Sequence, residues 1–527
     1  MPRVAGFEDV EFKNFTGLDL RGPTESLADR SLASLINMEV GDLGQLKTRP
    51  GFQLRNTSSP FNKPIKFIGH RSSNTQNAIL IQTIEDNYNS GHGTGFVYAS
   101  TDGGVTWTQI STPVGTQYAC GKGAQYGDNS IDIPALTGKQ AWNGSAWSSL
   151  AVGNNAIASS YDAVYLTDRY WTIEDSTGNV YFSELGNASD FRLVGGTKQN
   201  VIGFNLDNKD NIVGLCPYRD RMVVFFQNSI RIINCAGVPS TWTVKFIPFG
   251  VGVRSQNCYY VYNDLIYFLS SEGFYRTDLT QLEELSKPVQ SLFSRRWEAY
   301  QQNTAIYNKY TDAIGFWRGR FIISMRYYGK SGGSFAPLYK MLMYNIRNGA
   351  WSEIVPNIPC LDSILPWTPA TSFQSIFIGK RNPGGAQYNK EGLYTIFGDA
   401  NGRVHLFDDE DPVYYDGSSN ATTYACTVRT KDIDGGTPGE VKRSPTVGVR
   451  FKKSNTSNIS AKYTVNEVAR TPVNIASTTV PETSKIKGPG YFRKFNLELT
   501  DLSDQYLEIE GITVSAKKKQ GLSETAT

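Results

Sequence analysis

The chain has 527 residues, which is too long for one ordinary hydrophobic core and long enough for a repetitive ring with flanking pieces. Its 50 glycines, 29 tyrosines and 27 phenylalanines are typical of an all-β protein with many turns. The 52 Lys and Arg residues nearly balance the 49 Asp and Glu residues. The resulting net charge of +3 excludes an electrostatic basis for wrapping nucleic acid around a whole face.

The sequence predicts a soluble product of a reducing compartment. The N-terminal residues contain no apolar signal-peptide core. No window reaches the ~20 apolar residues that cross a bilayer. The cysteines are scattered, form no Cys-x-x-Cys pair and are expected to be free buried thiols; they are Cys120, Cys216, Cys235, Cys258, Cys360 and Cys426. We therefore expect synthesis in the cytoplasm and no membrane-spanning segment.

Residues 1–55 differ from the rest of the chain and are predicted to be a short docking segment. Residues 15–22 are turn-rich and extended. Residues 27–36 carry apolar side chains at helical spacing, which predicts one short amphipathic helix. A strand, a hairpin turn at 41–44 and a returning strand are expected over 37–50. Because the segment is short and partly apolar, it must pack on something larger.

One short pattern, a polar turn followed by a strand at a fixed offset, recurs at intervals of about 50 residues. Its copies begin at Asp168, Asp220, Asp264 and Gly319. Self-similarity at ~40–50 residues is typical of the blades of a β-propeller. One four-stranded blade cannot bury its own faces, so several must close into a ring.

Residues 56–424 are therefore predicted to form an all-β β-propeller of six or seven blades. Short strands centred on tryptophan recur as well, at Trp107, Trp147, Trp242 and Trp351. Two of them follow an Asn-Gly turn, which is the strongest short signal for a β-hairpin. About 360 residues at ~50 residues a blade give the expected number of blades.

Two further elements interrupt or follow the propeller. Residues 288–300 carry apolar side chains at helical spacing after Ser286, a plausible N-cap, and Pro288, which predicts a helix inserted between blades. Residues 425–516 alternate apolar and polar side chains, which predicts a C-terminal antiparallel β-sandwich-like domain. Residues 517–527 are expected to be a disordered tail.

The sharpest local motif matches an Asp-box, a β-hairpin clip found in sialidases and other propellers. Its residues are Ser100, Asp102, Gly104, Thr106 and Trp107. Asp102 would accept backbone hydrogen bonds across the turn, Gly104 would supply an unusual backbone angle, and Trp107 would pack on the blade. A sialidase would carry several such boxes and an Arg-Ile-Pro element. This chain has one strict box and no such element, which favours a structural clip.

No pattern in the sequence indicates an enzyme, a cofactor or a metal. The histidines His70, His92 and His405 are far apart along the chain. There is no Gly-x-Ser-x-Gly elbow, His-Glu-x-x-His pair or Walker loop. The acidic run 408–411 lacks the ligand spacing and the glycine of a calcium loop. We therefore expect no catalytic residue, no cofactor and no metal site.

Basic residues gather in the C-terminal part of the chain. Lys442, Arg443, Lys452 and Lys453 are the candidates for a surface that faces DNA. A solvated edge strand, on which lysine blocks aggregation, explains the same residues without a ligand. The sequence leaves both interpretations open.

The opening segment resembles a family of phage proteins. Residues 15–21 (Phe-Thr-Gly-Leu-Asp-Leu-Arg), the dipeptide Asn37-Met38 and residues 44–51 (Gly-Gln-Leu-Lys-Thr-Arg-Pro-Gly) are similar to a run that precedes propeller blades in that family. Its members are tail nozzle proteins, tail tubular protein B and the packaged-DNA stabilisation hub proteins of short-tailed phages. Residues 181–190 and 435–443 also fit. The candidate assembly residues on this run are Leu18, Arg21, Asn37, Arg49, Pro50 and Gly51.

The resemblance implies a structural, non-enzymatic protein of the virion tail. Six copies would form the nozzle or stopper ring that retains packaged DNA and provides the channel for genome ejection. The implied partners are other copies of the chain, adaptor or portal-side tail proteins, tail fibre or spike proteins and, transiently, packaged DNA. The Asp-box and the many aromatic residues support an alternative: a glycan-binding or glycoside-processing propeller that recognises a receptor.

Overall fold

Regular structure in this computed structural model is almost entirely β-strand over the described residues. The short 3-10 turns are η1 (Thr24–Ser26), η3 (Pro239–Thr241) and η4 (Lys287–Val289). The structure describes residues 8–54, 56, 61, 65–72, 77–84, 95–101, 106–110, 125–126, 130–133, 140–143, 145, 147–149, 160–174, 178–194, 197–204, 210–255, 258–293, 312–331, 334–355, 360–367, 394–399, 402–408, 414–415, 421–422, 424–434, 441–453, 458–475, 482–502 and 506–518.

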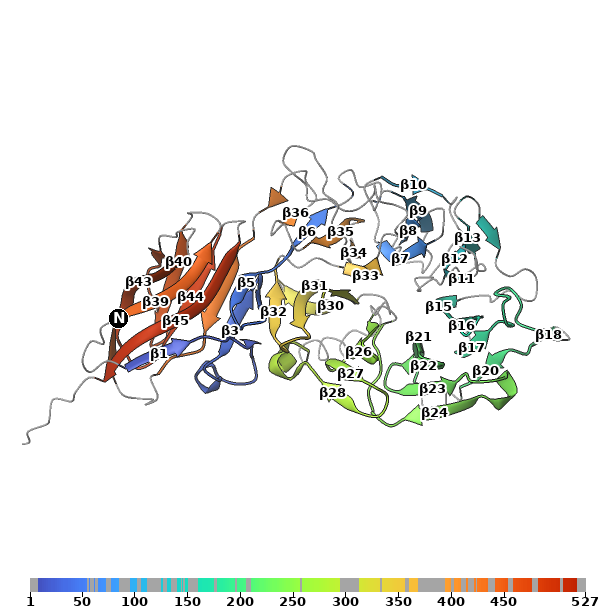
Figure 1. Cartoon of the computed structure of the whole chain (residues 1–527), viewed down its shortest axis with the longest axis horizontal. Coiled ribbons are helices and arrows are strands. Elements are labelled where there is room, and N and C mark those ends of the chain that lie inside the picture. Colours follow the sequence, from blue (N-terminus) through green and yellow to red (C-terminus); the bar gives the residue numbers. More distant parts are fainter. Residues whose placement is uncertain are drawn as a thin grey trace, which may run out of the picture.

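The described strands between the N-terminal segment and the C-terminal part form seven sheet units that follow one another around a ring (Figure 1). The first four units are β7 (Ile65–Ser72), β8 (Asn77–Ile84), β9 (Gly95–Ser100) and β10 (Thr108–Gln109); β11 (Gln125–Tyr126), β12 (Ser130–Ile133), β13 (Gln140–Trp142) and β14 (Trp147–Ser149); β15 (Ser160–Leu166), β16 (Arg169–Glu174), β17 (Asn179–Phe182) and β20 (Val201–Ile202); and β21 (Ile212–Tyr218), β22 (Arg221–Phe226), β23 (Ile230–Asn234) and β24 (Thr243–Ile247).

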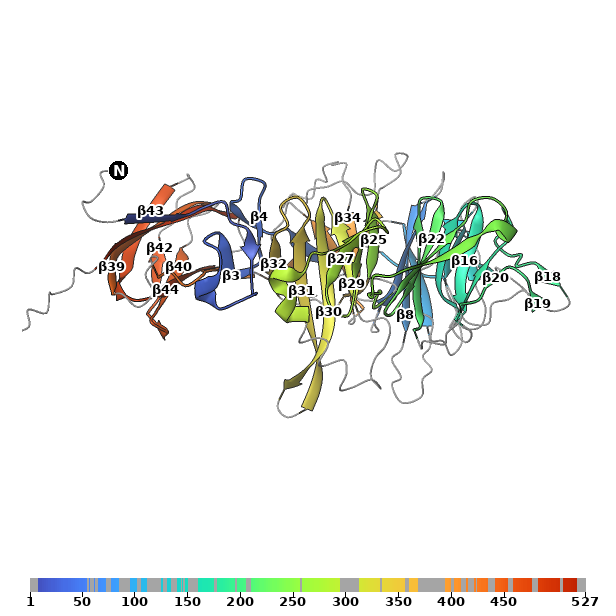
Figure 2. The same cartoon turned by 90° about the horizontal axis from the view of Figure 1, so that it is seen from below.

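The remaining three units continue in chain order, and Figure 2 shows the ring edge-on beside the C-terminal part. Their strands are β25 (Tyr259–Tyr262), β26 (Leu265–Leu269), β27 (Phe274–Thr277) and β28 (Leu282–Glu284); β29 (Ala313–Trp317), β30 (Arg320–Ser331), β31 (Ser334–Asn345) and β32 (Trp351–Ile354); and β33 (Cys360–Trp367), β34 (Tyr394–Asp399), β35 (Val404–Asp408) and β6 (Gly51–Leu54), with β36 (Tyr414–Tyr415) and β37 (Ala421–Thr422) beyond β6. A small hairpin of β18 (Leu193–Val194) and β19 (Thr197–Lys198) projects from the third unit.

The ring closes through its inner strands and through one N-terminal strand. β15 contacts β21, β25 contacts β29, β29 contacts β33, and β33 contacts β7 of the first unit. β6 supplies a strand of the last unit, where Phe52 lies opposite Phe407 of β35 in an antiparallel pair. Phe52 is fully buried with Trp317, Phe397 and Phe407. Radial repetition of four-stranded antiparallel sheets is the arrangement of a β-propeller.

The second strands of three consecutive units, β16, β22 and β26, are buried on both faces over nearly their whole length. In β22, Val223 and Phe225 belong to the core shared with the following unit, and Met222 and Val224 belong to the core shared with the preceding unit. A strand covered on both sides cannot alternate apolar and polar residues, so it reads as a continuous apolar run. This explains why Arg221-Met-Val-Val-Phe-Phe226 is almost entirely apolar.

The sequence repeat marks equivalent places in four consecutive units, as predicted. Each copy is the two-residue turn between the first and second strands, for example between Tyr262 and Leu265. Asn263 and Asp264 have φ values of 48° and 58°, and Arg318 and Gly319 have φ values of 43° and 84°. A two-residue hairpin that matches strand twist needs positive φ at both positions, which asparagine, aspartate and glycine tolerate best.

The C-terminal strands form two further sheets, one above the other (Figure 2). The first sheet has the order β4 (Met38–Val40), β5 (Leu46–Thr48), β45 (Leu507–Lys518), β39 (Lys442–Lys453) and β43 (Glu482–Phe492), with β1 (Glu8–Phe12) paired to β45. The second contains β2 (Gly17–Leu18), β3 (Ser31–Ile36), β38 (Cys426–Thr430), β44 (Phe495–Asp501), β40 (Ile459–Val465), β41 (Val468–Ala469) and β42 (Val473–Ile475). We call these two sheets the sandwich. β40 and β44 alternate buried and half-buried residues, as the sequence predicted for this region.

The N-terminal segment contributes strands to both the sandwich and the ring. β1 to β5 belong to the sandwich, and β6 belongs to the ring. Ile36 of β3 pairs with Glu353 of β32, so one continuous sheet runs from the sixth ring unit into the sandwich. The expected hairpin over 37–50 is confirmed, because β4 and β5 pair with Met38 opposite Thr48.

The helix predicted over 27–36 is wrong. Residues 31–36 form β3, which lies between β38 on one side and β2 and β32 on the other. Leu32 and Leu35 are buried because the strand is covered, and their spacing imitates a helical period. The helix predicted over 288–300 begins with η4 and is helical over 290–293; residues 294–300 lie outside the described part.

Candidate functional site

The strongest candidate site among the residues singled out in the sequence is the joint between the ring and the sandwich. Asn37 and Arg49 meet there, each with 1% of its surface exposed. The Asn37 Oδ1 atom accepts hydrogen bonds from Arg49 Nε at 2.8 Å and from the backbone N–H of Val355 at 2.9 Å. The Asn37 Nδ2 atom donates to the backbone carbonyl of Ala425 at 2.8 Å. One amide therefore holds a ring segment and a sandwich segment together.

Backbone conformation and ring stacking fix these two side chains. Asn37 adopts φ of 57° between β3 and β4, a left-handed conformation that asparagine tolerates better than most residues. The guanidinium of Arg49 lies 4.1 Å from the ring centroid of Tyr424, whose hydroxyl donates to the Arg49 carbonyl at 3.0 Å. Arg49 also donates to the carbonyls of Pro50 and Val355. A buried guanidinium is stable only when its donors are satisfied in this way.

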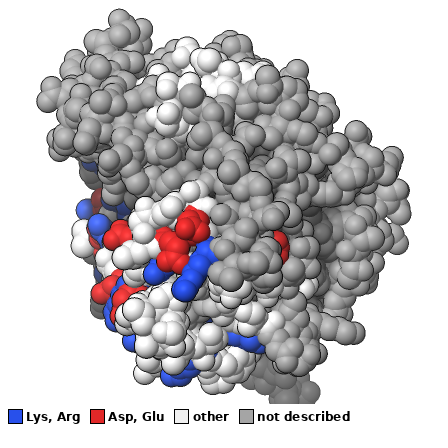
Figure 3. Space-filling view, turned by 90° about the vertical axis from the view of Figure 1, so that its right-hand side faces the viewer, with Lys and Arg blue, Asp and Glu red and all other residues white. Residues whose placement is uncertain are grey.

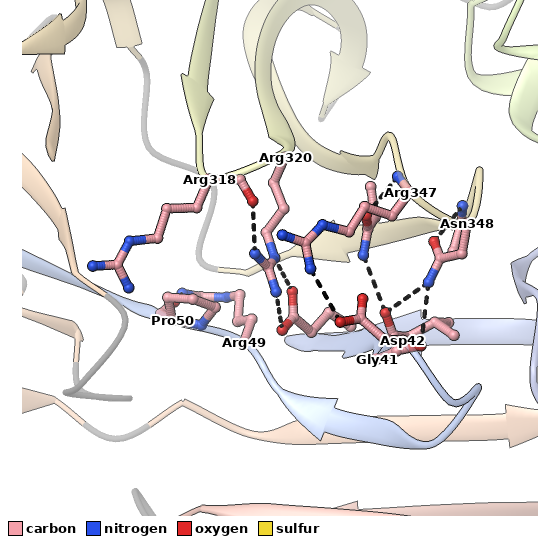
Figure 4. Close-up of polar contacts among 12 residues, drawn as sticks. Gly41, Asp42, Arg49, Pro50, Arg318, Arg320, Arg347 and Asn348 are labelled. Atoms are coloured by element: carbon pink, nitrogen blue, oxygen red, sulfur yellow. Dashed lines mark hydrogen bonds and ion pairs between the residues drawn. The ribbon is translucent and has the colours of Figure 1, made fainter. Parts of the chain in front are cut away.

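A second layer of polar contacts ties the β4–β5 hairpin to the sixth ring unit (Figure 4). Glu39, which is buried, pairs with Arg320, and the Arg320 Nη2 to Glu39 Oε1 distance is 2.7 Å. Asn345 and Asn348 both donate to the carbonyl of Val40. The outermost pair, Arg347 with Asp42 at 3.0 Å, is about two-thirds exposed on each side and adds little stability.

Three of the other candidate assembly residues are buried, and the fourth, Arg21, forms an ion pair on the surface. Pro50 and Gly51 are buried at the entry to β6. Leu18 is buried in β2. Arg21 is 60% exposed at its side chain and binds Asp19, with Arg21 Nη2 to Asp19 Oδ2 at 2.6 Å. Burial pulls the pKa of Asp19 upward, but the hydrogen bonds and charge of Arg21 outweigh it, so the pKa lies below its ordinary value.

Gly44 of the opening run is expected to resist substitution. Its φ is +78°, and a Cβ built on it would lie 2.4 Å from the Cα of Asn14. Gly44→Ala should therefore lower the free energy of unfolding by about 2 kcal/mol, which combines left-handed strain with a backbone clash. Gly490→Ala is the matched control, because Gly490 has φ of +80° and open space around it. Thermal unfolding of both variants tests this; equal losses would contradict the clash.

Cys426 lies at the joint and is expected to be inert in the folded chain. Its Sγ is 3.4 Å from the carbonyl of Asn37, and burial raises the pKa of the thiol to about 12. Because the thiolate is the reactive form, Cys426 should escape alkylation at pH 8 until the joint opens. A raised pKa also means that this contribution to stability is lost as the pH rises from about 9 toward 12. Peptide mapping after iodoacetamide treatment gives the measurement; rapid labelling of Cys426 in folded protein would contradict the expectation.

The described residues of the Asp-box belong to the β9–β10 hairpin. Ser100 is buried at the end of β9, Thr106 is exposed, and Trp107 is half-buried. The Trp107 ring packs edge-on against Phe61 with centroids 5.4 Å apart. Asp102 and Gly104 lie outside the described residues. The tryptophan therefore has the packing role expected of a clip.

The candidate DNA-facing residues divide into two pairs. Arg443 and Lys452 are exposed, and contact with DNA stays a prediction for both. Lys442 and Lys453 are buried, with 3% and 1% of their surfaces exposed, so neither reaches the surface of the described chain. Lys453 Nζ lies 2.7 Å from Asp501 Oδ1 in a pair with no exposed side-chain surface.

The buried Lys453–Asp501 pair was missed by sequence reasoning although a signal existed. Val447, Val449 and Phe451 point to the core, and Lys453 continues that alternation. Lys452 and Lys453, as neighbours in one strand, cannot occupy the same face. The pair links β39 of the first sandwich sheet to β44 of the second.

Charges at the outer end of the ring are mixed in sign. Figure 3 shows Asp and Glu side chains beside Lys and Arg on the described part of that face. Within the described residues there is no group of His, Cys, Asp and Glu that could hold a metal. None of the described helices is both long and apolar enough to cross a membrane.

No protein-family profile and no curated protein matches this sequence. Among solved structures, the extracellular domain of the one-component system BT4673 from B. thetaiotaomicron is similar over 90% of this chain and 63% of that chain, with 10% identity and a TM-score of 0.42. The WD40 domain of Neurospora crassa Pan2 is similar over 69% of this chain and 96% of that chain, with 10% identity and a TM-score of 0.38. The designed protein Ika8 covers 68% and 99%, with 9% identity and a TM-score of 0.33. These similarities are distant and concern the fold alone.

Proposed function

We propose that this chain is a structural protein of the virion, one of six copies that form the nozzle or stopper ring of a short phage tail. The ring would retain packaged DNA and provide the channel through which the genome leaves. The observation that carries the proposal is the joint: Asn37, Arg49, Pro50 and Gly51 belong to the run that resembles the phage family, and all four are buried where ring and sandwich meet. Here that run is the part of the chain that fixes two large bodies to each other.

A rigid joint between ring and sandwich is expected in a protein that resists the pressure of packaged DNA. Packaged DNA pushes outward on any stopper, and a chain whose two bodies share a continuous sheet and a buried polar joint resists bending between them. The near-neutral charge of the chain also favours passage of a duplex, because strong phosphate contacts would slow sliding DNA. On this proposal, contact with the tip or with fibres would shift the ring between closed and open states.

The proposal is tested by locating the chain in particles of the phage that encodes it. Antibodies against the purified chain, detected by gold labelling, should mark the tails of mature particles and leave tail-less heads unlabelled. Absence of the chain from purified particles would contradict the proposal. Binding of sialylated or neutral sugars by the pure chain on a glycan array would instead favour the Asp-box alternative.

Deletion of residues 1–51 is no clean test of docking. The deletion removes β1 to β5 from the sandwich and the start of β6 from the ring, so loss of tails would follow from misfolding alone. Variants of exposed residues are needed, and the two edges of the first sandwich sheet provide them.

A further inference from the structure

Two edge strands of the first sandwich sheet, β1 and β43, pair with no further strand among the described residues, whereas the third edge strand, β4, lies against β31 and β32 of the ring. β1 pairs only with β45 on one side, and β43 pairs only with β39 on the other. The two strands lie on opposite sides of the sandwich (Figure 1). An unpaired edge exposes a row of backbone donors and acceptors, which a strand of another chain can complete.

These two edges carry opposite charges. β1 reads Glu8-Asp-Val-Glu-Phe12 and contains no basic residue. β43 presents Lys485 and Lys487, both exposed, on either side of the buried Ile486. Lys13, which follows β1, offsets part of the acidic charge by pairing with Glu11 at 2.9 Å, and both side chains stay more than half exposed. Lysines that only block aggregation have no need of an acidic strand at the opposite edge.

The edges are also similar in length and match in direction. Pro489 lacks a backbone donor, and Gly490 has φ of +80°, so the pairing-competent part of β43 ends before them. What remains, 482–488, is two residues longer than the five residues of β1. β1 and β39 both run antiparallel to β45, and β43 runs antiparallel to β39. A second copy related by a small rotation would therefore bring its β1 antiparallel to β43, like every other pair in this sheet.

We infer that β1 of one copy adds to β43 of the next copy and joins their sandwiches into one continuous sheet. The antiparallel register that matches both faces places Glu11 opposite Lys485 and Asp9 opposite Lys487. The same register places Val10 opposite Ile486, on the face where Phe12 and Ile486 are buried. Opposite charges directly across a strand pair stabilise that pair, and like charges destabilise it.

This contact is head-to-tail, since it joins two different edges of the same chain. Repeated by a rotation that closes after six copies, as the proposed ring requires, a head-to-tail contact generates a closed ring. The inference rests on the proposed function, and it identifies the surface by which the copies meet: the sandwiches join side by side, and the rings of sheets lie beyond them.

Charge reversal tests the inference in particles of the phage that encodes the chain. Chains with Lys485→Glu and Lys487→Glu, or with Asp9→Lys and Glu11→Lys, place like charges across the contact. Each should lower the yield of tailed particles by about tenfold or more. A chain carrying all four changes restores opposite charges and should recover most of the yield. Particle yield unaffected by either half-reversal, or not recovered by the full reversal, would overturn the inference.

Disulfide trapping gives a direct readout of the register. Directly opposed residues of an antiparallel pair approach closely enough for a disulfide. A chain with Glu11→Cys and Lys485→Cys should, after oxidation of particles, give a ladder of cross-linked chains on a non-reducing gel. Glu11→Cys with Thr446→Cys is the matched control, because Thr446 is exposed on β39, one strand in from the edge. A ladder from the control alone, or no ladder from tails that contain the chain, contradicts this contact.

Different results would contradict the proposed tail function and the proposed contact between β1 and β43. A chain that is missing from particles contradicts the tail function itself. A chain that is present in tails, yet gives no cross-link between β1 and β43, leaves the tail function standing and removes only this contact.

Discussion

Replacing Asn37 with alanine is expected to lower the free energy of unfolding by about 3–5 kcal/mol, one of the two largest effects in this chain. The change removes the acceptor for Arg49 Nε and for the Val355 N–H, and the donor to the Ala425 carbonyl. Arg49 Nε is buried, and the Val355 N–H and the Ala425 carbonyl are partly buried, so water replaces the lost partners only in part. Alanine also tolerates the left-handed backbone of position 37 less well than asparagine.

A matched control exists in the sandwich. Asn466 also has a positive φ, of 50°, and its Oδ1 accepts from the backbone N–H groups of Arg493 and Lys494, but it is exposed at a hairpin turn. Asn466→Ala should cost about 1 kcal/mol. The measurement is urea unfolding followed by tryptophan fluorescence. Including Asn37→Gly, which relieves the backbone strain, separates the cost of that strain from the cost of the lost hydrogen bonds. If Asn37→Ala and Asn466→Ala lower the free energy of unfolding equally, the hydrogen bonds at the joint do not have the large stabilising effect expected of them.

The second large effect is expected at the buried pair of Lys453 and Asp501. Both side chains are fully buried and lie 2.7 Å apart. Removing one partner, as in Lys453→Met or Asp501→Leu, leaves a buried charge without its counter-charge and should cost about 3–5 kcal/mol. Removing both should cost far less than the sum of the two single changes, because no charge then remains in the core.

A double-mutant cycle measures this coupling. The two single variants and the double variant are compared with the parent by urea unfolding at constant pH, with circular dichroism as a second probe of the β content. Additive losses would show that the two charges do not depend on each other. The exposed pair of Arg347 and Asp42, treated in the same way, should show a coupling of at most about 1 kcal/mol.

The sequence predicts those parts of the fold that depend on local signals. Asp168, Asp264 and Gly319 mark hairpins because positive φ at a two-residue turn restricts the residue types there. The hairpin over 37–50 and the alternating strands β40 and β44 follow from equally local patterns. The turns predict the strands of the ring. Alternation of apolar and polar residues does not, because strands covered on both faces are apolar throughout.

What the sequence does not predict depends on pairing between distant segments. β3 is covered by β2, β32 and β38. Its apolar residues therefore do not alternate with polar ones as in a half-exposed strand, and their spacing resembles that of a helix. The joint brings Asn37, Arg49, Val355 and Ala425 together from parts of the chain more than 350 residues apart at the extremes, and no local rule reports such a contact. The resemblance points to Asn37 and Arg49 separately, and the hydrogen bond between them depends on the folded chain.

The proposed function makes this chain part of a phage tail, and cryo-electron microscopy of the corresponding mature particles tests that proposal directly. We expect six copies around the tail axis, each with its ring of sheets attached to its sandwich, and neighbouring sandwiches joined from β43 to β1. Tails whose density accommodates no such ring-and-sandwich body would contradict the account.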